Sequence, residues 1–512
     1  MNHCAMNNLV RKIIMMRTII RHTHLFFLSL LFFSSSLLHA QDTLILDLDQ
    51  VIMLAQDQSP QAVLAKHQFR ASYWTFRTYK AKYLPALTMN ATIPDFSRVF
   101  EREYDFNTGQ EYYVGKFRNN STLGLSLTQN IGATGGTVFL NTNLTRFDEF
   151  GDSPNTQYIS TPVSLGLRQP IFDFNPLKWE KKIEPVRYEE AKKRYLDAVE
   201  AVNARAVNLF FNLVLAQMNL EIAKINYHNS DTLYRIAQGR YNIGTIAEDD
   251  LLQMQLRFLN AGTALNQAGI DLQIREYQLR SFLGFNDNVK IELIVPNKIP
   301  ALTVDVSKAL VLAQQNNPDI LSYQRQLLEA RRDVMMAKRQ KGLNANLFAT
   351  FGYTQRAPTF PEAYQDLYSQ QRIQLGFDLP ILDWGRNKGK YKLAQSQEEV
   401  VKTNVRQNQI DFEQEVILNV AQFNLQDDQV AIAAKADTIA HKRYEVTKQR
   451  FLIGKISVLD LNVADSEKDV ARRGYITALR EYWSYYFNLR RLTLHDFIRD
   501  KDLAADFQKL VE

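Results

Sequence analysis

Residues that could carry acid–base, nucleophilic or metal chemistry are few in this sequence and are not grouped. The 512 residues include eight histidines and a single cysteine, Cys4. A Gly-x-Ser-x-Gly motif, a phosphate-binding glycine loop and a Cys-x-x-Cys pair are all absent from the sequence. The histidines beyond residue 40 have no partner at the spacing of a metal-binding pair: His67, His228, His441 and His495. The sequence therefore predicts no enzyme, no cofactor and no metal site.

Charged residues do recur in a fixed pattern around two glycines. The segment Arg240–Gly244 (Arg-Tyr-Asn-Ile-Gly) matches Arg450–Gly454 (Arg-Phe-Leu-Ile-Gly) at an offset of 210 residues. Asp250 and Asp460 each follow their glycine by six residues. The dipole of a helix favours acids in its first turn, so a purely structural explanation of the two aspartates stands beside any functional one.

The glycines separate long helices. Apolar residues spaced alternately by three and four form a heptad seam from Val199 to Tyr227, and the spacing restarts at Ala247. A straight helix would drift off such a seam, so the two helices of 199–283 are expected to supercoil on each other as a hairpin. Charges between the apolar positions favour a thin wall with solvent on both sides.

The chain is an internal duplication. Leu54–Pro60 resembles Leu312–Pro318, and Pro170–Asn175 matches Pro380–Gly385 at the same offset of 210 as the glycine motif. We therefore predict a first structural repeat over 41–300, a second over 301–496 and a C-terminal tail over 497–512. Each repeat holds a short helix, a second helix, strands, a long helix and a returning helix.

Residues 1–40 are predicted to be a secretory signal peptide. Basic residues precede the apolar run Leu25–Leu38, which is too short to span a membrane, and Leu38-His39-Ala40 follows as a cleavage signature. Met16 is a plausible true start. Removal of this segment lowers the net charge from +6 to +2 and removes Cys4, because it holds four basic and no acidic residues. The charge therefore gives no reason to expect nucleic-acid binding, and disulfides are excluded.

Between the helices the apolar period changes from the helical spacing to alternation, which indicates strands. The alternating apolar positions centre on Leu87–Ile93, Leu123–Leu127, Val163–Leu167, Leu347–Tyr353 and Ile373–Leu379. Their lengths suit tilted strands that cross a bilayer, although a soluble two-faced sheet has the same alternation. Val138–Leu144 is a further candidate, so an extra hairpin at 121–147 is expected, and the sequence leaves open whether it joins a barrel. Long aromatic-rich loops are expected at Phe96–Phe117 and Phe147–Tyr158.

The helix lengths suggest an architecture. Long helices are expected over Pro176–Ile243, where Pro185 should kink or delay the helix, and over Arg386–Leu452. At about 1.5 Å per residue each is expected to be an unbroken rod of roughly 90–100 Å. Returning helices over 247–283 and 457–492 would stack on the short helices beside each rod. Two to three strands per half cannot close a barrel within one chain, because about eight strands are the usual minimum. The barrel must therefore be shared among subunits.

These features resemble the TolC-like outer-membrane efflux proteins. The resemblance covers about 47–495 and rests on the duplicated helix starts, strand ends and Arg-Tyr/Phe-x-x-Gly hairpins quoted above. It implies a mixed, mostly α-helical fold in which an antiparallel coiled-coil α-barrel joins a β-barrel shared between three subunits. It also implies an outer-membrane location in a Gram-negative bacterium, with a large periplasmic part. The resemblance implies that the chain forms a homotrimer. The other implied partners are outer-membrane lipid, a periplasmic adaptor protein and an inner-membrane pump of resistance-nodulation-division or ABC type.

The resemblance also implies a gate at the hairpin ends, lined by acids one turn past each glycine. Asp250 and Asp460 match that position, and Gly244 and Gly454 form the turns. The sequence departs from the family pattern at Val463, where a second acid is often found, and at Phe451 and Ile456, which replace latching tyrosine and arginine residues. Phe451 has no hydroxyl, so we expect basic residues to hold the closed state instead: Arg240, Arg450 and Lys455.

The function expected is therefore a passive conduit that carries substrates from an inner-membrane pump across the periplasm and outer membrane. A coiled-coil envelope scaffold or adhesin without a lumen is the alternative, but it predicts uninterrupted helices. A simple porin predicts strands throughout and leaves the helices unexplained. The sequence does not specify the exported substrate, because drug, metal and protein export share this scaffold.

Overall fold

The computed structural model describes residues 43–104, 106, 108–151, 154–285, 289–296, 299–453 and 455–512. The predicted signal peptide, Cys4 and the turn residue Gly454 lie outside these residues. The described residues divide into two compact units, one within 43–59 and 206–296, the other within 60–205 and 299–512. The boundaries of the two predicted repeats remain a prediction, supported by a similar order of elements in each half of the chain.

The first unit is built on a helical hairpin. Its helices are the second part of α4 (Pro176–Asn242) and all of α5 (Glu248–Leu283), which ends at Gly284 in the left-handed conformation. Tyr227 and Phe258 stack across the hairpin with ring centroids 5.2 Å apart. Both belong to the predicted heptad seam, which explains why the two helices pair. Despite its internal Pro185, α4 is one helix.

Two short strands close the other end of this hairpin unit. β1 (Thr43–Leu46) pairs in parallel with β7 (Lys290–Leu293), and α2 (Leu48–Gln58) follows with Asp47 as its capping residue. The side chain of Gln217 on α4 donates to the carbonyl of Ile291 over 2.7 Å. This pairing could not be predicted from the sequence, because four-residue strands almost 250 positions apart have no recognisable period.

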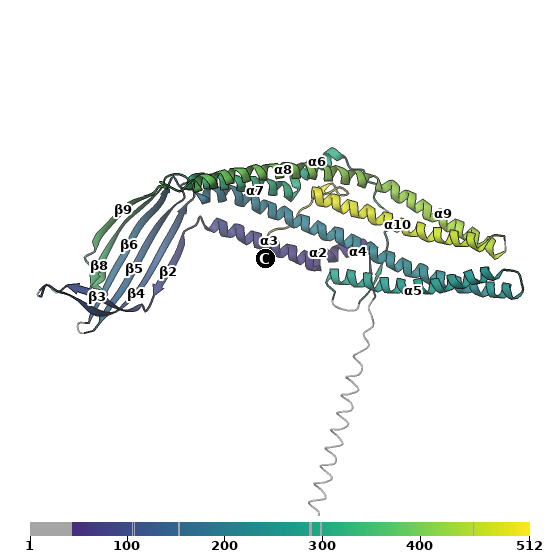
Figure 1. The fold of residues 1–512 in the computed structure, drawn as a ribbon, viewed down its shortest axis with the longest axis horizontal. Coiled ribbons are helices and arrows are strands. Elements are labelled where there is room, and N and C mark those ends of the chain that lie inside the picture. The colour runs from purple at the N-terminus through teal and green to yellow at the C-terminus, as the bar shows by residue number, and fades with distance from the viewer. Residues whose placement is uncertain are drawn as a thin grey trace, which may run out of the picture. The chain divides into compact units, whose positions relative to one another are not determined.

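The second unit contains a wall of helices. Its members beside the first part of α4 are α3 (Pro60–Ala81), α6 (Val306–Asn316), α7 (Pro318–Gln340), α8 (Arg386–Asn424), α9 (Gln426–Leu452) and α10 (Val458–Thr493). Tyr83, just after α3, donates its hydroxyl to the carbonyl of Leu177 on α4 over 2.9 Å. Arg325 on α7 bonds Glu190 on α4 over 2.6 Å, and α7 packs along α8. The order across the wall is therefore α3–α4–α7–α8 (Figure 1).

The second rod is interrupted, so the expectation of an unbroken helix over Arg386–Leu452 was wrong. α8 ends at Asn424 and α9 begins at Gln426, with Leu425 between them. The Asn424 side chain bonds both backbone groups of Val304 at 2.9 Å, and Gln426 donates to the carbonyl of Gln422. Side chains that bond backbone at this point explain the local break in the helical ladder.

Seven strands form one sheet in the second unit, in the order β2–β4–β5–β6–β8–β9 with β3 paired to β4 (Figure 1). The strands are β2 (Ala86–Thr92), β3 (Phe96–Tyr104), β4 (Glu111–Ile131), β5 (Gly136–Phe150), β6 (Asn155–Ile171), β8 (Asn344–Ala357) and β9 (Tyr368–Asp378). The extra hairpin joins the sheet as β4 and β5. The expected loop at 96–117 is largely a β3–β4 hairpin, because charged pairs such as Arg118–Glu101 stabilise strands whose apolar alternation is weak.

The sheet has one apolar and one polar face. Five residues that lie side by side across five adjacent strands show the pattern. All five are apolar and exposed: Leu87, Leu127, Leu140, Leu165 and Phe351. The adjacent row points to the opposite face and is polar or small: Thr88, Ser126, Asn141, Ser164 and Gly352. An exposed apolar face opposite a polar one is the pattern of a sheet between lipid and water.

Candidate functional site

The tip of the first hairpin is a tight glycine turn. Gly244 has φ +75°, a conformation that favours glycine, and its amide donates to the carbonyl of Tyr241 over 2.8 Å. Both the amide and the hydroxyl of Thr245 donate to the carbonyl of Arg240 over 2.9 Å. These bonds satisfy the last carbonyls of α4, so the predicted turn residue Gly244 and the predicted gate residue Arg240 belong to one compact tip.

Three consecutive acids open the returning helix of this hairpin. Glu248, Asp249 and Asp250 form the first turn of α5, whose capping residue Ala247 makes no side-chain bond. Glu248 and Asp249 are exposed and Asp250 is half-buried. Sequence reasoning singled out Asp250 and overlooked its two neighbours, although the run Glu-Asp-Asp is visible in the sequence. The tip therefore carries more negative charge than the family pattern alone implies.

The tip of the second hairpin places its predicted residues differently. The amide of Lys455 donates to the carbonyl of Arg450 over 2.9 Å, and both of these basic side chains are exposed. Phe451 is 7% exposed and belongs to the core of the unit. The two basic side chains are therefore open to solvent, whereas Phe451 contributes packing.

Asp460 lies at the start of α10 and is part of a capping box. Its Oδ2 accepts from the Ser457 hydroxyl at 2.7 Å and the Ser457 amide at 3.2 Å, while the Asp460 amide donates to Ser457 Oγ. These hydrogen bonds, together with Arg443 and Arg450 nearby, lower the pKa of Asp460. Asp460 is thus a fixed anion with a structural role, whereas Asp250 does not cap its helix.

Further ion pairs along the second hairpin were not predicted. Arg472 on α10 bonds Asp437 on α9 over 2.8 Å, and Arg443 bonds Glu467. Lys468 lies 2.8 Å from Asp465 and 4.0 Å from the centre of the Tyr444 ring. Burial opposes the charge on Lys468, but its carboxylate partners outweigh that effect and raise its pKa. The two arginine pairs and the contact of Lys468 with Tyr444 hold α9 to α10, whereas the Lys468–Asp465 pair lies within α10. Only side-chain positions in three dimensions reveal these contacts.

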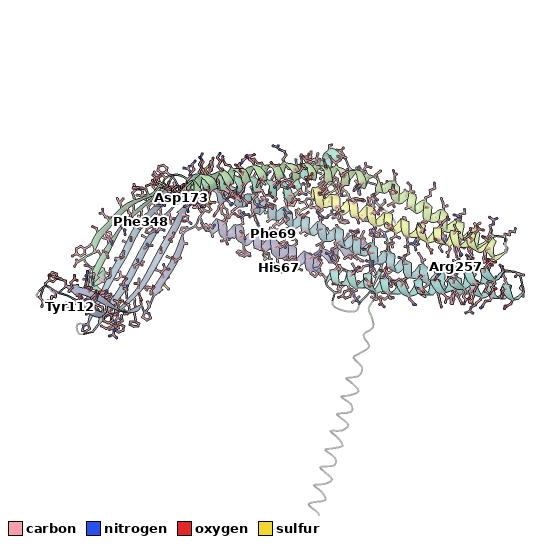
Figure 2. The ribbon with its side chains drawn as sticks, in the orientation of Figure 1. His67, Phe69, Tyr112, Asp173, Arg257 and Phe348 are labelled. Carbon is pink, nitrogen blue, oxygen red and sulfur yellow. The ribbon has the colours of Figure 1, made fainter. Side chains whose placement is uncertain are left out.

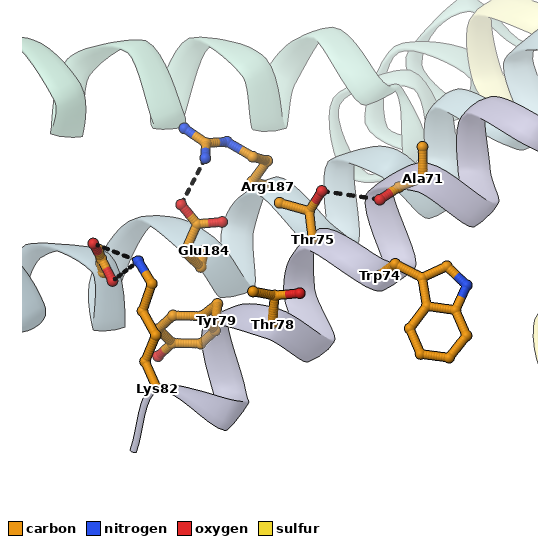
Figure 3. Close-up of a pocket in the computed structure, with 9 residues that line it drawn as sticks. Ala71, Trp74, Thr75, Thr78, Tyr79, Lys82, Glu184 and Arg187 are labelled. Atoms are coloured by element: carbon orange, nitrogen blue, oxygen red, sulfur yellow. Dashed lines mark hydrogen bonds and ion pairs between the residues drawn. The ribbon is translucent and has the colours of Figure 1, made fainter. Parts of the chain in front are cut away.

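An open groove of about 500 Å³ lies between α3 and α4 (Figure 3). Lys82 bonds Glu180 over 3.1 Å at one side of it, and Arg187 bonds Glu184 over 2.6 Å. Each charge in these two pairs has a partner of opposite charge, and none of the predicted site residues lines this groove. The Lys82–Glu180 pair joins the end of α3 to α4, whereas the Arg187–Glu184 pair lies within α4. The groove is therefore a seam of the helix wall.

The histidines do not form a metal site in the described part of the chain, where no group of three or more His, Cys, Asp or Glu residues is placed to hold an ion. His67 lies on α3 (Figure 2). His495 is isolated in the sequence but contacts two acids in the structure. Its ring nitrogens lie 2.7 Å from Asp502 and 3.1 Å from Asp500. This contact joins the two short strands β10 (His495–Asp496) and β11 (Lys501–Asp502) near the C-terminus.

Aromatic residues border the apolar face of the sheet. Phe96, Phe117 and Phe150 cluster on three neighbouring strands, with centroids 4.9 Å apart for the closest pair. All three rings are exposed. A ring of aromatic side chains at the edge of an apolar band is typical of strands that end at a membrane–water interface. The second unit therefore combines a membrane-facing sheet with long hydrated helices, which is the build of an outer-membrane channel.

Comparison with protein families identifies the class. The family model described as outer membrane efflux protein matches residues 118–285 and 309–493. The chain belongs to the outer membrane efflux protein family. It is an outer-membrane efflux channel protein of a Gram-negative bacterium, and its family and fold are those of channels. The predicted resemblance, the mixed and mostly α-helical fold and the outer-membrane location are confirmed.

Several solved structures share this fold at low sequence identity. The CmeC outer-membrane channel of Campylobacter jejuni is 18% identical, with a TM-score of 0.65 over 90% of this chain and 88% of that chain. The open state of MtrE from Neisseria gonorrhoeae is 13% identical, with a TM-score of 0.58 over 90% and 91%. VceC of Vibrio cholerae is 15% identical, with a TM-score of 0.56 over 87% and 95%. A comparison with curated protein sequences finds no match.

Proposed function

We propose that three copies of this chain form a passive conduit through the periplasm and the outer membrane. The observation that carries the proposal is the seven-strand sheet with an exposed apolar face, in a chain that also forms long helical hairpins. Among the described residues, the outer sides of β2, β3 and β9 have no partner strand. Such a sheet is stable in lipid only when its edges are paired, so neighbouring copies are needed to close it. Three is the number that the family resemblance implies.

The conduit does no chemistry of its own and takes its energy from other proteins. A periplasmic adaptor would contact the hairpin tips, and an inner-membrane pump of resistance-nodulation-division or ABC type would deliver the substrate. Family membership supports this arrangement, and no enzymatic activity is proposed. The rival scaffold or adhesin is disfavoured because a protein without a lumen has no need of a sheet whose inner face is polar.

The hairpin tips would form the gate at the periplasmic end. In a trimer the acids of α5 and Asp460 of α10 would each occur three times around the entrance. Fixed negative charge in a narrow passage attracts cations and binds multivalent ones, which block it. Arg240, Arg450 and Lys455 carry the opposite charge at the same tips and would hold the closed state through ion pairs.

The test is conductance across planar bilayers of the purified trimer with Asp250→Asn and Asp460→Asn combined. Asparagine keeps an acceptor oxygen for the Ser457 cap, so the change removes charge while the helix start remains. We expect weaker cation preference and weaker block by multivalent cations. Asp428→Asn, in the first turn of α9 and away from the tips, is the matched control and should change neither property. Unchanged block in the double variant would exclude these acids from the gate.

A further inference from the structure

The sheet has six strand positions in each chain. β2 pairs with residues 122–128 of β4 and β3 with residues 111–119, so β2 and β3 occupy successive stretches of one edge position. β4, β5, β6, β8 and β9 supply the other five. Both outer positions, β2/β3 and β9, have one side without a partner strand among the described residues.

The β4–β5 hairpin is a full part of this sheet. β4 and β5 are in register from the pair Phe117–Phe150 to the pair Ile131–Gly136, which spans the whole of β5. The apolar row that begins at Leu87 on β2 passes through Leu140 on β5 before it reaches Leu165 on β6. Without β5 this lipid-facing row would be broken, so the hairpin is not an appendage outside the wall.

The turn of this hairpin is anchored to the helix wall. The side chain of Asn175, at the start of α4, donates to the carbonyl of Gly132 over 3.1 Å. Gln129 donates to the carbonyl of Tyr83 over 2.6 Å, and Asn130 to that of Lys82 over 3.0 Å, both at the end of α3. The hairpin therefore stands between the strand that leaves α3 and the strand that enters α4.

The widths of the two walls agree with six strands. Strands about 4.7 Å apart and tilted by about 40° each occupy roughly 6 Å of circumference, so six occupy about 37 Å and four only about 25 Å. The helices α3, α4, α7 and α8 continue from the sheet, and four packed helices occupy about 36 Å at roughly 9 Å each. At this tilt, six strands match the width of the four helices more closely than four strands would.

We propose that three chains close an eighteen-stranded barrel, with β2 of one copy paired to β9 of the next. This inference rests on the trimeric conduit proposed above and specifies its exit. The same geometry gives a backbone diameter of about 35 Å for eighteen strands and about 24 Å for twelve. If side chains form a layer of about 5 Å inside the wall, the lumen is about 25 Å wide in the eighteen-stranded barrel and about 14 Å wide in a twelve-stranded one. At this tilt the exit is therefore wider than that of a twelve-stranded barrel.

The sequence supplies a matched control. Residues Leu125–Ile131 at the end of β4 resemble Leu165–Ile171 at the end of β6, and both Gln129 and Gln169 donate to turn carbonyls. Deletion of 125–164 joins the first part of β4 to the last part of β6. The two strands run in the same direction, and Leu125 and Leu165 both face the apolar side, so the join keeps the alternation. The shortened chain has four strand positions.

The test is the distance between spin labels in the purified trimer. Ala349→Cys places a label on the apolar face of β8, and the mature chain is predicted to have no other cysteine. From the two radii, equivalent Cα atoms of three copies lie about 31 Å apart in an eighteen-stranded barrel and about 21 Å apart in a twelve-stranded one. We expect the longer distance in the full chain and the shorter one after the deletion.

Three results are distinguishable. A distance near 21 Å in the full-length trimer would overturn the wide barrel and leave the conduit intact. Failure to isolate a trimer at all would instead overturn the proposed function. If the shortened chain does not fold, the full-length distance still decides, and Thr142→Cys on β5 gives a second reading, because it reports barrel geometry only if the extra hairpin lies in the wall.

Discussion

Replacement of Arg490 by methionine tests the buried ion pairs that join α10 to α4 and to β10. Arg490 donates to Glu200 over 2.9 Å and lies 3.3 Å from Asp496. The carboxylate side chains are 4% and 9% exposed, so water cannot replace the lost partner. Asp496 keeps bonds from the Tyr486 hydroxyl and two backbone amides, whereas Glu200 keeps a bond from the Asn203 side chain. Breaking such a pair costs about 3–5 kcal/mol, which at about 2.1 cal/mol/K per residue lowers the melting temperature of a chain of this length by roughly 3–5 °C.

The assay is thermal unfolding of the purified protein in detergent, followed by circular dichroism. Burial raises the pKa of Glu200, and Arg490 opposes that rise. Since the folded-state pKa lies above the usual 4.5, the ionised carboxyl costs stability as the pH rises through it, and protonation removes that cost. The deficit of Arg490→Met should therefore shrink as the pH is lowered, and the addition of Glu200→Gln should restore most of the lost stability.

Arg235→Met is the control for this experiment. Its ion pair with Asp231 spans 3.1 Å, but the arginine side chain is 74% exposed, so the loss should stay below about 1 kcal/mol. Two results would refute the reasoning. One is an Arg490→Met protein whose melting temperature equals that of the wild type. The other is a deficit that is the same at about pH 5 and about pH 8, where an uncompensated carboxylate must behave differently.

Two further substitutions test local features. Ser457→Ala removes the cap of α10, so the first turn should lose about 1 kcal/mol of stability and its backbone amides should exchange hydrogen faster. Since the pKa of Asp460 is lowered below its usual 3.8, the wild-type protection should be lost only as the pH falls through that lowered value. Equal exchange in both proteins at neutral pH would rule out the cap. Gly166→Ala adds a methyl that overlaps the Phe139 ring on β5, so thermal stability should fall by about 1–3 kcal/mol, whereas Gly376→Ala meets open space and should not change it. Equal melting of the two glycine variants would contradict the β5–β6 register.

Much of the helical part could be predicted because its signals are local. The heptad seam predicted the α4–α5 hairpin, and the Asn-Pro pair at Asn175 predicted the start of α4 to the residue. Ser457-x-x-Asp460 carries the sequence signature of a capping box, so the structural role of Asp460 was also visible. The break at Leu425 could not be predicted, because it depends on a hydrogen bond between the Asn424 side chain and the backbone 120 residues earlier.

The sheet was predicted only in part, for a related reason. Alternation of apolar residues marks a strand where one face meets lipid, and it revealed β2, β4, β6, β8 and β9. It fails where cross-strand charges replace apolar contacts, as in β3 with its Glu101–Arg118 pair. It also could not say which strands are neighbours, because pairing of β5 between β4 and β6 is a property of the register.

The gate residues show the limit of motif matching. Asp250 and Asp460 occupy equivalent positions in the two repeats, yet only Asp460 caps its helix. Phe451 matches a latch position in the sequence and lies in the core of its unit. Equivalent sequence positions thus have different surroundings, and which charges face the passage depends on three-dimensional contacts that a single sequence does not encode locally.

Electron cryomicroscopy of the purified mature protein in detergent tests the central claim most directly. A trimeric conduit predicts particles with three-fold symmetry and a continuous hollow along the symmetry axis, with a helical part near 100 Å long. A solid rod would favour the coiled-coil scaffold. A compact barrel without the helical tube would favour a simple porin. Either of these two results would contradict the conduit.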